Sequence, residues 1–332
     1  MIRDQGSGSA ASGPAGAGQP EGEVFDLGYR HYDGPRGGRG TAFVAVYADG
    51  LRMVTGLGRG TAAKIMPLIF ALLAMGPALF IVFLAGVITS FGGDPDDIEL
   101  PQHHEYYVFT FVVMLLFAAT VAPGLLSPDR RNSVIALYTV RPLTSIDYAL
   151  ARWLAFFTFA LAFALIPQAL LYASFMLSDD SPGGYVKDNL RDLPAIIGVG
   201  LILAAFMTAV AMAAAALTTR RAFATAGVIA FIFITAAVGG FGQDILTSEE
   251  DRIEYRRIHG PRQGDETQAP DGDAAHFIHL LILPETLGRF SEWLFDRRDT
   301  FPISPWYNAA TIAAVIGGSF GVLGFRYRRM EA

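Results

Sequence analysis

The 332-residue chain contains no cysteine. Disulfide bonds, thiol catalysis and thiolate metal sites are therefore excluded, although this absence alone assigns no compartment. The N-terminal stretch 1–23 is rich in Gly, Ala, Ser and Pro and lacks the apolar core of a secretory signal. We expect 1–23 to be a disordered cytosolic tail, because this composition cannot offset the entropy that ordering removes.

Charge is missing from six long apolar runs, in a chain whose hydrophobic content is 52%. About 20 residues suffice for a helix to cross the hydrocarbon core of a bilayer, so each run can form a transmembrane span. The sequence predicts an all-α integral membrane protein with six transmembrane helices. The predicted spans are 65–91, 106–126, 153–177, 195–219, 222–243 and 305–325.

None of these runs contains Asp, Glu, Lys, Arg or His. Proton- or sodium-driven secondary transporters normally keep such a group at membrane depth, and an intramembrane hydrolase needs a buried nucleophile and base. Both classes are disfavoured. The stretch 56–64, "GLGRGTAAK", lacks the spacing of a phosphate-binding loop. We therefore predict no catalytic residue and no cofactor in this chain.

Histidines give the only hint of a metal site. His103 and His104 are adjacent in one predicted outer loop, and His276 and His279 lie three residues apart in another, with acidic residues near both pairs. Imidazole and carboxylate groups together can hold zinc or copper. A solvated surface is the favoured interpretation of these pairs, and we predict no metal.

Positive residues are divided unequally between the loops. The loop 92–105 has no Lys or Arg, whereas the loop 126–152 has four arginines. Lys and Arg near span ends favour the cytosolic side, so we expect both termini in the cytosol of a multi-pass protein of the cytoplasmic membrane. The acidic residues then gather in the outer loops, and the net charge of −6 implies no nucleic-acid partner.

Two amphipathic regions flank the spans. A cytosolic linker, 24–64, precedes the transmembrane domain, 65–329, and within it 41–57 has apolar residues at helical spacing. This predicts an interfacial elbow helix on the inner leaflet, in contact with membrane lipid. In the extracellular segment 244–304, the second half predicts two short helices divided by Pro284. The elbow is characterised by Phe43, Tyr47, Leu51 and Arg52.

The stretch between the second and third spans has a layout of its own. A charged cluster, 129–132, precedes an apolar patch, 134–138, and Pro142 stops that segment. Thr144 and Asp147 have the spacing of a helix cap, so a new helix should run from there into the third span. A loop lying on lipid headgroups would explain the arginines. A short helix tied to two spans is better suited to docking a partner that moves the membrane domain.

These features resemble the membrane subunit of type 2 ATP-binding cassette exporters, six-span permeases that work as dimers with a separate ATPase. The family shares the order of charged cluster, short apolar helix, proline and new helix start, together with an elbow helix, a tight hairpin at 220–221 and paired outer helices. The stretch 34–60 is similar to the N-terminal segment of such permeases in high-GC Gram-positive bacteria. The resemblance covers 28–329, and Asn132-Ser133 stands where the family often has Gly-Thr.

The resemblance implies a permease subunit that exports a substrate, lipid-like or amphiphilic in one interpretation. ATP and Mg²⁺ would be bound by a separate ATPase subunit, and the permease would form a homodimer or pair with a similar permease. A membrane scaffold that transports nothing, and binds a partner through its acidic outer loops, is the alternative. The implied ATPase-docking residues are Asp129, Arg130, Arg131, Asn132, Val134, Leu137, Tyr138, Arg141, Pro142 and Asp147 in a cytosolic coupling helix and its flanks, with Arg220 and Arg221 as a second, smaller site.

Overall fold

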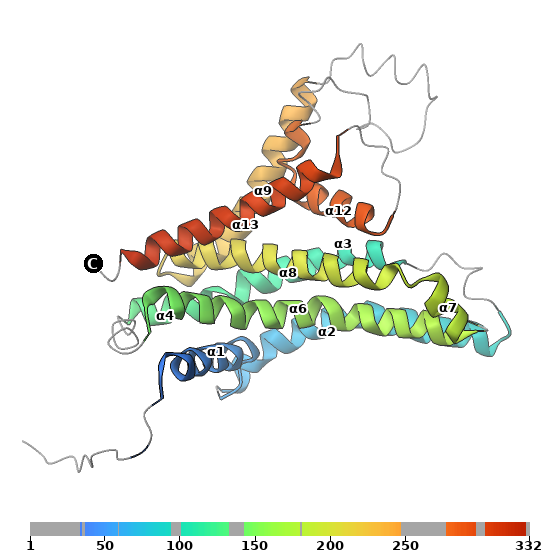
Figure 1. The fold of residues 1–332 in the computed structure, drawn as a ribbon, viewed down its shortest axis with the longest axis horizontal. Helices are drawn as coiled ribbons and strands as arrows, with labels where there is room; N and C mark the ends of the chain where they lie inside the picture. The colour runs from blue at the N-terminus through green and yellow to red at the C-terminus, as the bar shows by residue number, and fades with distance from the viewer. Residues whose placement is uncertain are drawn as a thin grey trace, which may run out of the picture. The chain divides into compact units, whose positions relative to one another are not determined.

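A computed structural model describes residues 34, 37–58, 60–93, 101–132, 143–179, 181–246, 277–296 and 303–329. Within these ranges the regular secondary structure is helical and contains no strand, which confirms the predicted all-α class. The predicted tail and the coupling segment 133–142 lie outside them. The helices, labelled in Figure 1, are α1 Arg39–Thr55, α2 Thr61–Ser90, α3 His103–Val121, α4 Pro123–Arg131, α6 Ser145–Ser178, α7 Pro182–Asp188, α8 Asp192–Leu217, α9 Arg221–Leu246, α12 Leu283–Leu294 and α13 Pro305–Arg328.

In the part of the chain that the structure describes, six helical segments are long and apolar enough to cross a membrane. Each contains most or all of one predicted charge-free run, so the prediction of six spans is confirmed at that level. The chain thus has the architecture of a multi-pass helical membrane protein. The six segments are Ala63–Ser90, His103–Arg131, Ser145–Ser178, Asp192–Leu217, Arg221–Gln243 and Pro305–Arg328.

The spans differ in how much of their surface the protein itself covers. In the most apolar stretch of 18 residues, 72% of α8 is buried, compared with 17% of α13. Helix α8 contacts α6, α13, α9 and α3, while α6 lies between α8 and the pair α1 and α2 (Figure 1). Helices α6 and α8 are therefore the centre of the bundle, around which the other spans pack.

Aromatic stacking fixes α3 against α6 in this centre. The ring of Phe117, which is fully buried, stacks on Phe156, Phe159 and Phe163 with centroid distances of 5.4, 5.2 and 5.3 Å. Three rings spaced along one face of α6 thus pack around a single ring of α3. Such aromatic pairs add about 0.5–1.5 kcal/mol each beyond the area that they bury.

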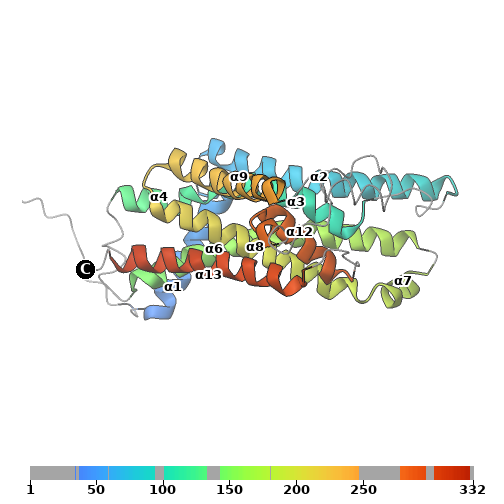
Figure 2. The ribbon, with the colours of Figure 1, turned by 90° about the horizontal axis from the view of Figure 1, so that it is seen from above.

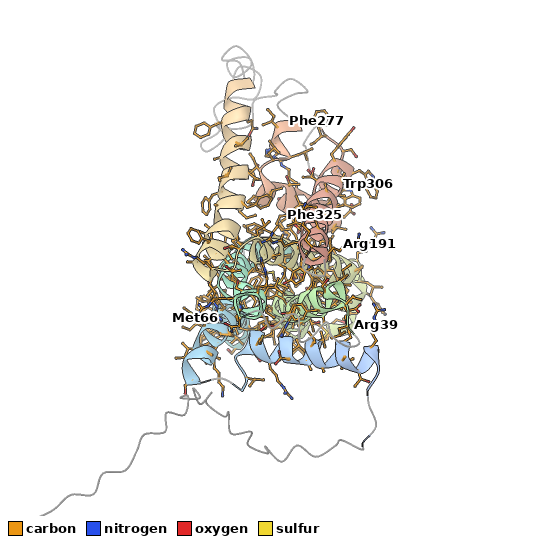
Figure 3. All side chains as sticks on the ribbon, turned by 90° about the vertical axis from the view of Figure 1, so that its left-hand side faces the viewer. Arg39, Met66, Arg191, Phe277, Trp306 and Phe325 are labelled. Atoms are coloured by element: carbon orange, nitrogen blue, oxygen red, sulfur yellow. The ribbon has the colours of Figure 1, made fainter. Side chains whose placement is uncertain are left out.

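Large apolar side chains cover the outside of the bundle. Met66 on α2, Trp306 and Phe325 on α13, and Phe277 are 45–68% exposed, and Figure 3 shows them pointing away from the core. So many exposed large apolar side chains are unusual on a soluble monomer and match a lipid-facing surface or a subunit contact.

The start of the third span follows its predicted cap. Thr144 Oγ1 accepts a hydrogen bond from the backbone N–H of Asp147 at 3.2 Å, and Asp147 Oδ2 accepts one from the N–H of Thr144 at 3.0 Å. This reciprocal pair satisfies two of the N–H groups that a helix leaves without partners. The predicted helix start at 144–147, running through Arg152 into the third span, is confirmed.

The second span is longer than predicted. Its helix breaks at Pro123, whose missing N–H suits the first position of a new helix, and α4 then continues past the predicted end at 126. Asp129, Arg130 and Arg131, which we expected in a loop, therefore lie in the last turns of a helix. The next predicted feature is confirmed: α8 ends at Leu217 and α9 begins at Arg221, so the two arginines at 220–221 form a tight hairpin.

Helix α1 corresponds to the predicted elbow, shifted by two residues. It ends at Gly56, which adopts φ 71°, and Leu57 beyond that end is exposed. Its buried face consists of Val46, Gly50 and Val54 and packs on α6. Of the predicted elbow residues, Phe43, Tyr47 and Leu51 are half-buried and Arg52 is exposed. The contact of this helix with lipid stays a prediction.

Two short helices lie between spans at the opposite end from α1 and α4 (Figure 1). Helix α7, between the third and fourth spans, was not predicted. Helix α12 begins at Leu283 with Pro284 in its first turn, and a single helical turn at 277–279 precedes it. The structure therefore shows one of the two predicted short helices, preceded by a single turn, and Pro284 lies in the first turn of α12 rather than between two helices.

Candidate functional site

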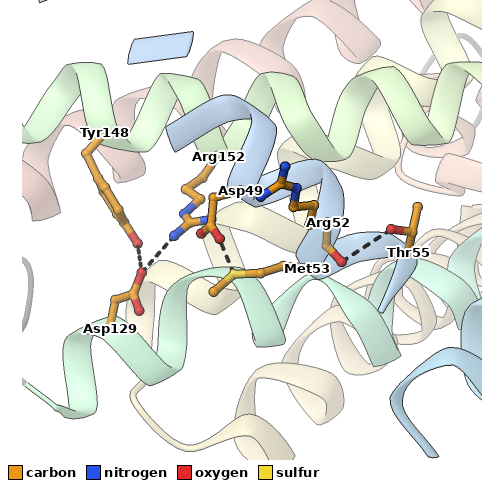
Figure 4. Close-up of polar contacts among 7 residues, drawn as sticks. All are labelled: Asp49, Arg52, Met53, Thr55, Asp129, Tyr148 and Arg152. Atoms are coloured by element: carbon orange, nitrogen blue, oxygen red, sulfur yellow. Dashed lines mark hydrogen bonds and ion pairs between the residues drawn. The ribbon is translucent and has the colours of Figure 1, made fainter. Parts of the chain in front are cut away.

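The site with the most unusual chemistry surrounds Arg152, whose side chain is fully buried. Its Nη1 atom donates to Asp49 Oδ2 of α1 at 2.7 Å, and its Nη2 atom donates to Asp129 Oδ2 of α4 at 3.1 Å (Figure 4). Arg152 itself belongs to α6. One guanidinium thus joins three helices, of which α1 is far from the other two in the sequence.

Tyr148 completes this group, which we name the Arg152 cluster: Asp49, Asp129, Tyr148 and Arg152. The Tyr148 hydroxyl donates to Asp129 Oδ2 at 2.6 Å, and the Arg152 guanidinium carbon lies 5.4 Å from the centroid of the Tyr148 ring. Tyr148 and Arg152 are four residues apart on α6, so their side chains share one helix face. A carboxylate with two donors on one oxygen is held firmly in place.

The two carboxylates of the cluster differ in exposure. The side chain of Asp49 is 49% exposed, whereas that of Asp129 is 11% exposed. A buried charge is tolerated only when it is paired and hydrogen-bonded, and Asp129 meets that condition through Arg152 and Tyr148. The ion pair with Asp129 is therefore the structural one, while the pair with Asp49 reaches the surface of α1.

Arg130, the neighbour of Asp129, ties α4 to a different helix. Its Nη1 atom donates to the backbone carbonyl of Ala216, and it lies 3.3 Å from the carbonyl of Ala215 and 3.4 Å from that of Thr218. These carbonyls end α8 and have no partner within the helix, and the negative end of the helix dipole favours a cation there. Helix α4 is thereby fixed to α1 and α6 on one side and to α8 on another.

Arg39 makes a second ion pair at the same end of the bundle. Its Nε and Nη2 atoms donate to the two carboxylate oxygens of Asp147 at 2.8 and 2.7 Å. The Arg39 side chain is 63% exposed and that of Asp147 is 13% exposed. The carboxylate that caps α6 thus also holds the first residue of α1.

Because Asp147 serves two contacts and Arg39 only one, their substitutions should differ. We expect Arg39→Gln to lower the free energy of unfolding only slightly, because solvent screens an exposed ion pair. Asp147→Ala also removes the cap of α6 and should lower it by about 1–2 kcal/mol. Denaturant titrations of the two purified variants measure this difference. Salt at about 1 M should weaken the ion pair between Arg39 and Asp147 but not the hydrogen bonds that cap α6. Equal losses would contradict the double role of Asp147.

The predicted docking residues fall into three groups. Arg131 and Asn132 at the end of α4, and Arg220 and Arg221 in the hairpin, are exposed. A second group makes the contacts described above within the chain: Asp129, Arg130 and Asp147. A third group lies outside the residues that the structure describes: Val134, Leu137, Tyr138, Arg141 and Pro142.

The contacts that join Arg152, Tyr148 and Asp49 to the rest of the cluster were not predicted from the sequence. Arg152 directly precedes the charge-free run 153–177, where an arginine is typically assigned to lipid headgroups. Two signals were available: the four-residue spacing of Tyr148 and Arg152, and an aspartate placed within the apolar stripe of α1. The six runs contain no charged residue, and the buried Arg152 lies one position before the third run.

One member of each histidine pair, His103 and His279, is buried rather than solvated. His103 is 5% exposed, and its Nδ1 lies 2.6 Å from Gln168 Oε1 of α6. His279 is 3% exposed, and its Nε2 lies 2.9 Å from Glu285 Oε2, a hydrogen bond that holds the pKa of Glu285 below its ordinary value. His276 is outside the described ranges. Among the residues that are described, no group of three His, Asp or Glu side chains could hold a metal ion.

No protein-family model matches this chain, and no curated protein is significantly similar to it. The fold alone therefore defines its class, which is that of a multi-pass helical membrane protein. At one end of the bundle, ion pairs and hydrogen bonds of Arg152 and Arg130 hold α1, α4, α6 and α8 together.

Proposed function

We propose that this chain is the permease subunit of an ATP-binding cassette exporter, which couples to a separate ATPase subunit at the end of the bundle that carries the Arg152 cluster. The observation that supports this proposal is the fixation of α4. Asp129 is bonded to α6 and, through Arg152, to α1, while Arg130 is bonded to the end of α8. A displacement applied to the end of α4 is therefore passed to three other helices.

The exposed residues next to these contacts are suited to a partner. Arg131 and Asn132 follow directly after the anchored residues, and the hairpin arginines 220–221 follow the α8 carbonyls that Arg130 binds. In this proposal Asp129, Arg130 and Asp147 hold the docking segment in position, and Arg131, Asn132, Arg220 and Arg221 contact the partner together with the segment 134–142.

The remaining parts of the proposal follow from the same assignment. Both termini are cytosolic, since the end of the bundle with more arginines faces the cytosol. The ATPase subunit binds ATP and Mg²⁺. Two permease chains associate through apolar faces that one chain leaves exposed, including the glycines 317, 321 and 324 of α13, around which nothing lies within 4 Å of an added Cβ.

The test is a charge reversal at the docking segment, Arg131→Glu combined with Arg141→Glu. The chain is purified from native membranes with its ATPase, and both ATP hydrolysis and ATPase retention are measured. We expect the reversed variant to lose more than about tenfold in ATPase retention, since two like-charge contacts at an interface cost several kcal/mol. Arg191→Glu is the matched control, because Arg191 is 92% exposed and lies before α8, at the other end of that span.

Two results would count against the proposal. Full ATPase retention and coupling in the reversed variant would remove the docking assignment. If no ATPase accompanies the unmodified chain from native membranes, the exporter assignment itself fails, and the alternative of a membrane scaffold that transports nothing takes its place.

A further inference from the structure

A large groove lies at the other end of the bundle, away from the Arg152 cluster. It has a volume of about 510 Å³ and is bounded by α3, α8, α9 and α12. Helix α9 runs beside α3 (Figure 2), and the groove lies between them. This volume falls within the range of about 300–1,000 Å³ that is typical of small-molecule sites.

The walls of the groove are mostly apolar. They include Val108, Phe111, Val112 and Leu115 on α3 and Phe233 on α9, of which Val108, Val112 and Phe233 are more than half exposed. From residue 105 to residue 115 the α3 wall is about 15 Å long at 1.5 Å per residue. The groove thus offers a long apolar surface of the shape that one alkyl chain fills.

One polar group in the groove lacks a partner. Ser291 of α12 lines the groove and is 5% exposed, and its Oγ atom has no hydrogen-bond partner among the described residues. A buried hydroxyl without a partner costs free energy, so native structures normally satisfy such a group with a ligand or water. Ser291 therefore places one unsatisfied hydroxyl in the α12 wall of the groove.

The charged residues that line the groove are both acidic. Glu105 of α3 and Glu292 of α12 belong to its lining, and the described lining contains no Lys or Arg. Glu105 follows His104, and Glu292 lies three residues before Phe295. Because the rings of His104 and Phe295 are 6.3 Å apart, the two glutamates belong to the same end of the groove. Ser291 is next to Glu292 in the sequence, so the polar end of the groove carries a hydroxyl and two carboxylates.

We propose that this groove binds an amphiphile that has an apolar chain and a cationic headgroup, with the chain along α3 and the headgroup between Glu105 and Glu292. Apolar walls along one side and two carboxylates at one end match that ligand and oppose an anionic one. That such amphiphiles are exported rests on the proposed function. That they bind here rests on the groove alone.

The experiment compares two photoreactive probes with the same alkyl chain and a diazirine at its end. One probe has a trimethylammonium headgroup and the other a sulfate. The chain is reconstituted in nanodiscs of phosphatidylcholine, irradiated with each probe, and digested for mass spectrometry. We expect the cationic probe to label peptides of α3 and α9 about threefold to tenfold more than the sulfate probe, the range that one or two partly exposed ion pairs provide.

Matched variants separate charge from shape. Glu105→Gln with Glu292→Gln should abolish the preference for the cationic probe, and the new amide at position 105 can still cap α3, because a capping box accepts Glu or Gln there. Val112→Trp should reduce labelling by both probes, since it fills the groove. Asp188→Asn and Val238→Trp change an exposed acid and an exposed apolar residue outside the groove and should leave labelling unchanged.

The outcomes are distinct. Equal labelling by the two probes, or labelling that Val112→Trp does not reduce, overturns the inference. Selective labelling that disappears in the double glutamate variant supports it. If selective labelling is found but the cationic probe neither stimulates a co-purified ATPase nor is transported, the binding site stands and the exporter proposal is contradicted, so the two failures can be told apart.

Discussion

Replacing Arg152 with methionine is expected to lower the free energy of unfolding by about 3–5 kcal/mol, because removing one partner of a buried ion pair leaves the other charge buried without compensation. Methionine has a similar length and no polar atom, so the loss reports the charge rather than a cavity. Among the residues that the structure describes, Asp129 would then keep only its hydrogen bond from Tyr148. Thermal melting and denaturant titration in detergent measure the loss.

Two further substitutions test the explanation. Asp129→Asn, on the side of the cluster that is 11% exposed, should be clearly more destabilising than Asp49→Asn, whose side chain is 49% exposed. Arg191→Met is a control, because Arg191 is 92% exposed and its pair with Asp296 is 3.9 Å long. If Arg152→Met is no more destabilising than this control, the buried pair is not what holds α1, α4 and α6 together.

A second large effect is expected at the crossing of α1 and α6. A Cβ atom added at Gly50 would lie 2.6 Å from the Cβ of Ala155, which is fully buried. Alanine has the better helix propensity by about 1 kcal/mol, so Gly50→Ala would be stabilising on an exposed helix. Here we expect a loss of about 1–3 kcal/mol instead, because the two helices must separate.

The rescue is specific. Ala155→Gly removes the methyl group that Gly50→Ala would meet, so the double variant should recover most of the lost stability. The double variant should therefore lose much less stability than the sum of the two single variants. Gly40→Ala, on the same helix, is the control, since nothing lies within 4 Å of its added Cβ. The same unfolding titrations apply, and additive losses would show that the close approach of α1 and α6 does not limit this crossing.

The spans and their caps could be predicted because their signals are local. Charge-free runs of sufficient length determine the spans, and the three-residue spacing of Thr144 and Asp147 determines where the third span begins. The hairpin at 220–221 followed from length alone, since one helix through both runs would exceed the bilayer thickness.

The Arg152 cluster could not be predicted in the same way. Arg152 and Asp49 are 103 residues apart, and they meet only because α1 folds back onto α6. An arginine at the end of an apolar run reaches lipid headgroups as readily as a carboxylate, and the run itself does not distinguish the two. His103 is a parallel case, because its partner Gln168 is 65 residues away on another span.

The groove between α3 and α9 is framed by two close contacts of α9. Thr225 Oγ1 of α9 donates to the Ala119 carbonyl of α3 at 2.7 Å, and so closes the gap between these helices on one side of the groove. On the other side, an added Cβ at Gly239 would lie 2.5 Å from Ile282, so α9 packs tightly there too. The groove is thus a lateral opening between helices, with a close contact of α9 on each side of it. In the binding mode proposed above, an amphiphile enters the groove sideways, between α3 and α9, and we expect these two contacts to limit the size of the headgroup that can follow its chain.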